Sequence, residues 1–144
     1  MRYDLTLNEF CKSTIEKKEL LVYDPYTWRP YCHVKDFSRI ILKVLKLKNN
    51  LINNKIYNIG SDDLNYRKID IVKFLKKQIN FKVNYLKKSI DQRNYRVDFS
   101  KMRKELQIAP KYSAEYGIKE ILLQLKKKQV SRDLGNYQIK SNVR

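Results

Sequence analysis

The sequence has few of the residues on which common catalytic and metal-binding sites depend. Its 144 residues include three glycines, two cysteines and one histidine. Gly60, Gly117 and Gly135 are too far apart to form a glycine-rich loop around a phosphate or dinucleotide. Cys11 and Cys32 form neither a CxxC motif nor a cluster with histidine, so no zinc site and no disulfide framework is indicated. We therefore expect two reduced thiols.

Long hydrophobic runs are missing as well. No apolar stretch reaches the roughly 20 residues that a membrane-spanning helix needs, and no signal-peptide pattern occurs. The sequence also shows no Ser/His/Asp arrangement and no carboxylate pair for acid–base chemistry. It therefore predicts a cytoplasmic protein with no membrane partner, no catalytic residue and no metal ligand set.

Acidic residues are outnumbered, with 15 Asp and Glu against 32 Lys and Arg and a formal net charge of +17. Such a charge attracts anions in general, including nucleic acid. The lysines are scattered over expected helix surfaces instead of being gathered in one arm, which favours solvated helix faces over a nucleic-acid site. A small basic nucleic-acid-binding protein stays as an alternative from another functional class.

What the sequence does contain is organised around residues 28–36, Trp-Arg-Pro-Tyr-Cys-His-Val-Lys-Asp. A strand is expected before this stretch, over 19–23, and a helix after it, over 36–48, with Asp36 as its N-cap. The helix pattern places Phe37, Ile40, Ile41, Val44 and Leu45 on one buried face. The stretch predicts a loop that presents Arg29, whose planar guanidinium can grip a phosphate or carboxylate with two parallel hydrogen bonds.

The rest of the chain alternates between helical and strand patterns. Strands are predicted over 55–59 and 81–86 and helices over 4–18, 68–80, 98–106 and 113–125, with Asp4, Asp98 and Ser113 as candidate caps. Gly60 is expected to need a positive φ. The alternation indicates an α/β fold with few strands in one domain over 1–125, followed by a loose basic tail over 126–144.

Four motifs follow one another along the chain. They are Arg-Pro-Tyr-Cys-His-Val-Lys-Asp at 29–36, Tyr-Asn-Ile-Gly at 57–60, Arg-Asn-Tyr-Arg-Val-Asp-Phe-Ser-Lys at 93–101, and Glu-Leu-x-x-x-Pro at 105–110. In order and spacing they resemble the NAD-dependent nucleotide-sugar epimerases and dehydratases of carbohydrate metabolism, the extended short-chain dehydrogenase/reductase family. Gln107 stands where that family usually has glycine.

The resemblance covers only the C-terminal part of such an enzyme, because no Gly-x-x-Gly-x-x-Gly is present. It implies a small α/β substrate-binding lobe that lacks most of the Rossmann domain. We therefore expect the chain to be the nucleotide-sugar-binding portion of an epimerase or dehydratase, inactive alone, and its own enzymatic status stays open. NAD is the cofactor of the full-length family, and none is expected to bind this chain alone.

The resemblance also implies the substrate-binding residues. Arginines at positions matching Arg29 and Arg93 contact the nucleotide-sugar diphosphate in the family, and two such forks from distant segments can clamp it from two sides. An ordinary surface salt bridge is the alternative for each. Tyr95 is a candidate for stacking on a base or sugar, with burial as the alternative. Asn8 lies on the first predicted helix, near where related enzymes present substrate contacts.

Tyr31 and Lys35 have the Tyr-x-x-x-Lys spacing of the family's catalytic pair. We reject this match, because the segment is predicted to be extended and four residues along a strand span roughly 13 Å, against about one helical turn in the family. The family's own pair belongs upstream, outside this chain. His33 is interpreted as packed and hydrogen-bonded instead of catalytic.

Two further interpretations stay open. In the first, the chain is one half of a split epimerase, whose partner is a separately encoded N-terminal Rossmann chain. In the second, it is a degraded remnant without activity.

Overall fold

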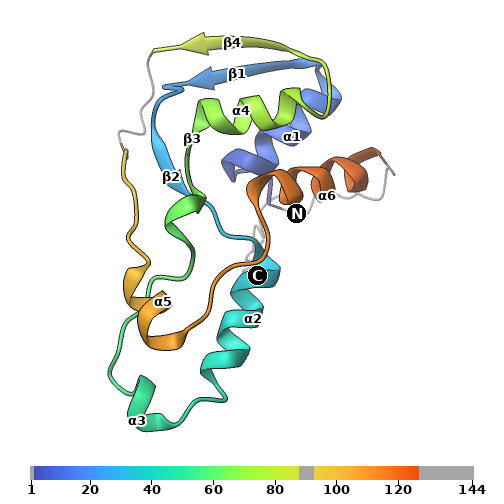
Figure 1. Cartoon of the computed structure of the whole chain (residues 1–144). Coiled ribbons are helices and arrows are strands. Elements are labelled where there is room, and N and C mark those ends of the chain that lie inside the picture. Colours follow the sequence, from blue (N-terminus) through green and yellow to red (C-terminus); the bar gives the residue numbers. More distant parts are fainter. Residues whose placement is uncertain (1, 88–92, 127–144) are drawn as a thin grey trace, which may run out of the picture.

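The computed structural model describes residues 2–87 and 93–126. The chain starts with α1 (Thr6–Glu16), β1 (Glu19–Tyr23), β2 (Trp28–Pro30), α2 (Val34–Val44) and α3 (Asn49–Ile52). A 3-10 turn η1 (Asp62–Leu64) leads into β3 (Asn65–Arg67), α4 (Lys68–Lys76) and β4 (Lys82–Leu86). It continues with α5 (Ser100–Leu106) and α6 (Ala114–Lys126) (Figure 1). Apart from Lys126, the tail predicted over 126–144 lies outside the described residues.

Two small sheets organise this mixed α/β fold. β1 pairs in parallel with β4, and β2 pairs antiparallel with β3, with Trp28 opposite Arg67. The β1 strand has the predicted bounds, whereas β3 was not predicted. Arg29 lies within β2 and not on a loop, so that prediction was wrong: β3 supplies an edge with which Trp28–Pro30 can pair.

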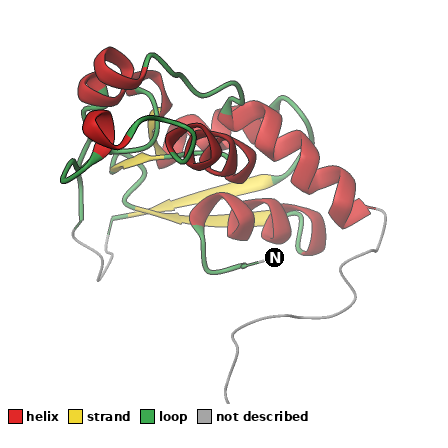
Figure 2. Ribbon diagram, turned by 90° about the horizontal axis from the view of Figure 1, so that it is seen from below, coloured by secondary structure: helices red, strands yellow, loops and turns green. Residues whose placement is uncertain are grey.

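Helices α1, α4 and α6 lie on one side of the β1/β4 sheet (Figure 1), and Figure 2 shows these strands from below, past the helices. The sequence dictates this, because Leu20 and Val22 alternate in β1 with Leu21 and Tyr23 and are buried, whereas the latter two are half-exposed. The core under the sheet also contains Phe10, Cys11, Ile71, Val72, Leu75, Phe81, Ala114, Ile118 and Leu122.

A second cluster lies between α2 and α5, around Ile40, Met102, Leu106 and Ile108. Of the five residues predicted on the buried face of α2, only Ile40 is buried, and Val44 is partly so. Phe37, Ile41 and Leu45 are exposed, so the prediction was wrong for them. Among the described residues, α2 contacts the rest of the fold along a narrow stripe that contains Ile40 and Val44. The apolar face of the helix is wider than this stripe, so its remaining side chains are exposed.

The strand predicted over 55–59 does not form. Its alternation has another use, because Tyr57 and Ile59 pack against the second cluster. Gly60 does have a positive φ, of 158°. A Cβ at this position would lie 2.5 Å from the ring of Phe99, so close approach to that ring requires glycine there.

Some helices start at a residue other than the predicted cap, because the side chain of the predicted cap binds another group. Asp4 does not cap α1, because its carboxylate pairs with Arg2 and the N-cap is Leu5. Ser113 acts as predicted, because its hydroxyl accepts the backbone N–H of Tyr116 at 3.2 Å. Asp98 lies one residue before the N-cap of α5, which is Phe99, although its carboxylate accepts the backbone N–H of Ser100 at 2.7 Å.

The predicted cap of α2 was also wrong. The helix begins two residues before Asp36, and His33 is its N-cap, with Nδ1 accepting the backbone N–H of Lys35 at 3.2 Å. Asp36 is fully buried inside the first turn. Its carboxylate accepts hydrogen bonds from Arg39 and from the backbone of Lys111 and Tyr112, so it holds distant segments together instead of capping its own helix.

Candidate functional site

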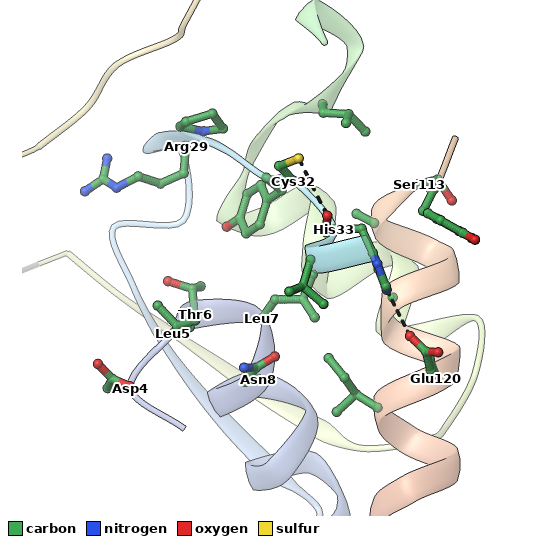
Figure 3. A pocket seen from close by; sticks show the side chains of 18 of the residues that line it. Asp4, Leu5, Thr6, Leu7, Asn8, Arg29, Cys32, His33, Ser113 and Glu120 are labelled. Atoms are coloured by element: carbon green, nitrogen blue, oxygen red, sulfur yellow. Dashed lines mark hydrogen bonds and ion pairs between the residues drawn. The ribbon is translucent and has the colours of Figure 1, made fainter. Parts of the chain in front are cut away.

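A cavity of about 790 Å³ lies between the start of α1, strand β2 and helix α6. All four residues predicted to bind substrate line it: Asn8, Arg29, Arg93 and Tyr95 (Figure 3 labels the first two). Segments that are far apart in the sequence thus meet at one hollow. Their role in binding stays a prediction.

Arg29 is held in place from two directions. Its Nη1 donates a hydrogen bond to the carbonyl oxygen of Trp28 at 2.7 Å. Its Cζ lies 5.3 Å from the centroid of the Tyr95 ring, a distance at which the ring face attracts the cation. Tyr95 is 47% exposed, so the alternative of burial does not apply to it. The ring instead supports the guanidinium at the cavity wall.

Arg93 opens a segment that runs beside β2. The side-chain oxygen of Asn94 accepts the backbone N–H of Trp28 at 2.9 Å, and the backbone N–H of Tyr95 donates to the Trp28 carbonyl at 3.4 Å. Further on, the amide side chain of buried Asn65 exchanges two hydrogen bonds with the backbone of Val97. The segment is thereby fixed on both sides of Tyr95.

The opposite side of the cavity has a different character. His33 Nε2 lies 2.9 Å from a Glu120 oxygen, and Lys35 pairs with the same carboxylate. Because Nδ1 accepts the Lys35 N–H, the proton of a neutral His33 lies on Nε2 and is donated to Glu120. His33 is therefore packed and hydrogen-bonded, as predicted. Lys35 and then His33 lower the pKa of Glu120 despite partial burial.

Sequence reasoning missed Glu120 entirely. It lies on α6, where neither of the two glutamates of the helix belongs to a motif, and only the fold brings it to the start of α2. Aromatic rings of Tyr112 and Tyr116 surround His33 at centroid distances of 4.9 and 5.7 Å. These contacts fix the junction between α2 and α6 that forms this wall.

Two cavity residues with acidic protons, Tyr31 and Cys32, are poorly suited to chemistry near neutral pH. Burial raises the pKa of Tyr31 to about 12, although Arg29 opposes the shift. Burial also raises the pKa of the Cys32 thiol to about 11, assisted by Asp36. A catalytic base or nucleophile needs the opposite shift. Since Lys35 pairs with Glu120, the Tyr-x-x-x-Lys spacing at Tyr31 carries no catalytic pair.

Neither a metal centre nor a membrane span is found in the described part of the chain. Among residues 2–87 and 93–126, no group of three or more His, Cys, Asp or Glu side chains is placed to hold a metal ion. None of the described helices combines the length and the hydrophobicity needed to cross a membrane. The cavity's chemistry thus depends on its arginines and on the polar wall at Glu120.

Comparison with known proteins gives two findings. Residues 6–60 match the model of the NAD dependent epimerase/dehydratase family. Among solved structures, UDP-glucuronic acid 4-epimerase from Bacillus cereus, in complex with UDP-glucuronic acid and NAD, is 25% identical with a TM-score of 0.74, and the match covers 88% of this chain and 41% of that one.

Two other similar structures differ in substrate. The dTDP-glucose 4,6-dehydratase from Bacillus anthracis, in complex with NAD, is 24% identical with a TM-score of 0.66, and the match covers 90% of this chain and 41% of that one. The L-threonine dehydrogenase from Phytophthora infestans is 16% identical with a TM-score of 0.72, and the match covers 83% of this chain and 40% of that one. At these identities both show the shared fold alone.

The predicted resemblance to NAD-dependent epimerases and dehydratases of the extended short-chain type is confirmed. The chain spans about two fifths of the length of these structures.

Proposed function

We propose that this chain is the nucleotide-sugar-binding portion of an NAD-dependent epimerase or dehydratase, the family that its residues 6–60 match. The observation that carries the proposal is that Arg29 and Arg93, from separate segments of the chain, line one cavity. The substrate is then a nucleotide-sugar, with its diphosphate between the two guanidinium groups.

The physical basis is the match between a planar fork and a diphosphate. A guanidinium donates two parallel hydrogen bonds to two oxygens at once, which an ammonium group does not. Tyr95, stacked against Arg29, fixes the direction of that fork before the substrate arrives, and fixing it beforehand lowers the entropy lost on binding. Such a clamp positions the sugar without taking part in bond breaking.

Threonine, the substrate named for one neighbour, carries no diphosphate. The two arginines therefore favour a nucleotide-sugar over an amino acid as the ligand of this cavity.

We further propose that these 144 residues alone have no oxidoreductase activity. NAD supplies the hydride acceptor in the family, and the three cavity or neighbouring groups that come nearest to a catalytic role are unsuited to it. Tyr31 and Cys32 have raised pKa values, and Lys35 is engaged by Glu120. The binding of NAD then belongs to a Rossmann part outside the described residues.

An open strand edge supports a partner for this lobe. Among the described residues β1 pairs only with β4, so its other edge presents backbone donors and acceptors beside a hollow of about 440 Å³ between α1 and β1. A two-stranded sheet is marginal by itself. A separately encoded N-terminal Rossmann chain that adds a strand here is the proposed partner. Co-purification of the two chains, lost when β1 pairing is blocked by Leu21→Pro, tests this.

Isothermal titration with UDP-glucuronic acid, ADP, dTDP and L-threonine tests the main proposal. We expect a nucleotide ligand to bind, and Arg29→Ala or Arg93→Ala to weaken it by about tenfold each, or about 1.4 kcal/mol. Arg29→Lys should lose nearly as much, because it keeps the charge but not the fork. Lys101→Ala, which removes a surface cation that hydrogen-bonds the Ile56 carbonyl, is the matched charge control and should bind normally.

Three results would overturn the proposal. One is equal affinity of the arginine variants and the control, and another is binding of L-threonine in preference to every nucleotide. The third is turnover of a nucleotide-sugar by the purified chain with NAD. Tight, strongly salt-dependent binding of DNA or RNA would instead support the nucleic-acid alternative.

A further inference from the structure

We propose that Trp28, the only tryptophan in the chain, is a positioning residue that holds Arg93 next to Arg29 by gripping Asn94 and Arg96. The inference rests on the proposed function, since it explains how one arginine of the clamp is placed. Trp28 does not line the cavity, so its action on substrate is indirect.

The Trp28 ring is flanked by two guanidinium groups. The Arg67 Cζ lies 5.5 Å from the ring and the Arg96 Cζ 5.0 Å, both within range of a cation–π attraction. Arg67 is directly opposite Trp28 in the β2/β3 ladder, and it is fixed further by two hydrogen bonds to Asp70 at the start of α4. The indole is thus anchored to the β2/β3 sheet through Arg67, and Arg96 connects residues 93–97 to it.

Side-chain alternation explains why this grip orients Arg93. In an extended segment successive side chains point to opposite sides. Arg93 and Tyr95 line the cavity, whereas Asn94 accepts a hydrogen bond from the backbone N–H of Trp28 and Arg96 contacts the Trp28 ring, and neither of these two lines the cavity. Holding Asn94 and Arg96 against Trp28 therefore turns Arg93 and Tyr95 toward Arg29.

The position of Trp28 along this segment matters as well. Asn65 fixes the segment at Val97, beyond Arg96. Among the described contacts of residues 94–97, those with Trp28 and Arg29 are the nearest to Arg93. If they are lost, Val97 stays in place while the backbone that carries Arg93 is no longer held against β2, and the direction of the Arg93 side chain changes without loss of the core.

Arg96→Ala is the primary test, because Arg96 is exposed and its replacement leaves the core intact. We expect a red-shifted emission of the single tryptophan and faster hydrogen exchange of the Tyr95 amide, which donates to the Trp28 carbonyl. UDP should bind about tenfold more weakly to Arg96→Ala, but less than about twofold more weakly when Arg93→Ala is already present, since the two changes act through one residue. Arg96→Lys keeps a cation and Trp28→Phe keeps an aromatic ring, so each of these variants should bind UDP more tightly than Arg96→Ala does.

Lys101→Ala removes the same charge and a comparable contact, that with the Tyr57 ring at 5.1 Å, and should change none of these readouts. The inference would be overturned if Arg96→Ala weakened UDP binding by the same factor in the wild type and in Arg93→Ala, because Arg96 would then act independently of Arg93. If Arg93→Ala does not weaken UDP binding, the proposed function fails. The positioning role of Trp28 is still tested by hydrogen exchange of the Tyr95 amide in Arg96→Ala. Unchanged exchange would overturn that role, and faster exchange would support it.

Discussion

Asp36 accepts the backbone N–H of Lys111 through both of its carboxylate oxygens, at 2.9 and 3.0 Å. The backbone N–H of Tyr112 donates to the same carboxylate at 2.9 Å, and Arg39 pairs with it at 2.8 Å. A fully buried charge thus ties the first turn of α2 to the segment that enters α6. Since α6 forms one wall of the cavity, this contact places that wall relative to β2.

Replacement of Asp36 should therefore destabilise the fold. We expect Asp36→Asn to lower the free energy of unfolding by about 3 kcal/mol, because it leaves buried donors without a charged acceptor. Asp63→Asn, which removes an exposed carboxylate, is the control and should change stability by less than about 0.5 kcal/mol. Urea denaturation followed by circular dichroism measures both. Equal midpoints for the two variants would contradict this account of Asp36.

The same carboxylate should make stability depend on acidic pH. Burial by itself raises the pKa of Asp36, but hydrogen bonds from Arg39, Tyr112 and Lys111 outweigh it and keep the pKa below the ordinary value of 3.8. A depressed folded-state pKa means that the unfolded chain binds more protons, so the stabilisation is complete above the ordinary pKa and is lost as pH falls through the folded-state value.

The stability difference between the wild type and Asp36→Asn should consequently be constant near pH 6 and shrink below about pH 4. Denaturation at several pH values and constant ionic strength measures it. A difference that stays the same down to pH 3 would show that folding does not lower the pKa of Asp36.

Two glycines provide a matched pair of substitutions. Gly60→Ala places a Cβ 2.5 Å from the Phe99 ring, at a φ of 158°, and should cost about 2 kcal/mol of stability. Gly117→Ala, inside α6, meets only His33 Cδ2 at 3.4 Å and should be neutral or stabilise by up to about 1 kcal/mol, because alanine favours helix. Thermal melts compare them directly. Greater damage from the Gly117 change would be the contrary result.

The cysteines should be unreactive in the folded protein. Burial raises the pKa of Cys11 to about 12 and that of Cys32 to about 11, so almost no thiolate is present at pH 8. Iodoacetamide at pH 8 should label both thiols at least about 100-fold more slowly in the native state than in urea. Mass spectrometry after timed quenching reports each site. Rapid labelling of native Cys32 would indicate a more open cavity wall than the structure has.

Local pattern was a reliable guide where a segment's own residues decide its conformation. The strand at Glu19–Tyr23 and the cap at Ser113 were predicted from alternation and from one side chain next to a helix start. The predictions failed where a distant segment competes. Asp36 satisfies Lys111 and Tyr112 instead of capping α2, and residues 55–59 find no strand to pair with.

The candidate site divides in the same way. Arg29, Arg93, Tyr95 and Asn8 were singled out from motifs, yet nothing in their spacing placed them at one cavity. Glu120 and Trp28 carried no motif, and their roles follow only from contacts with His33 and Arg96.

The sequence by itself determined the strand at Glu19–Tyr23, most of the helices and which side chains are able to bind an anion, because periodicity and donor chemistry are properties of neighbouring residues. Only the tertiary structure decided that Arg29 and Arg93 line one cavity, that Trp28 contacts Asn94 and Arg96, and that Asp36 is buried. The physical reason is that these relations depend on long-range packing and hydrogen bonds, whose partners lie dozens of residues away along the chain.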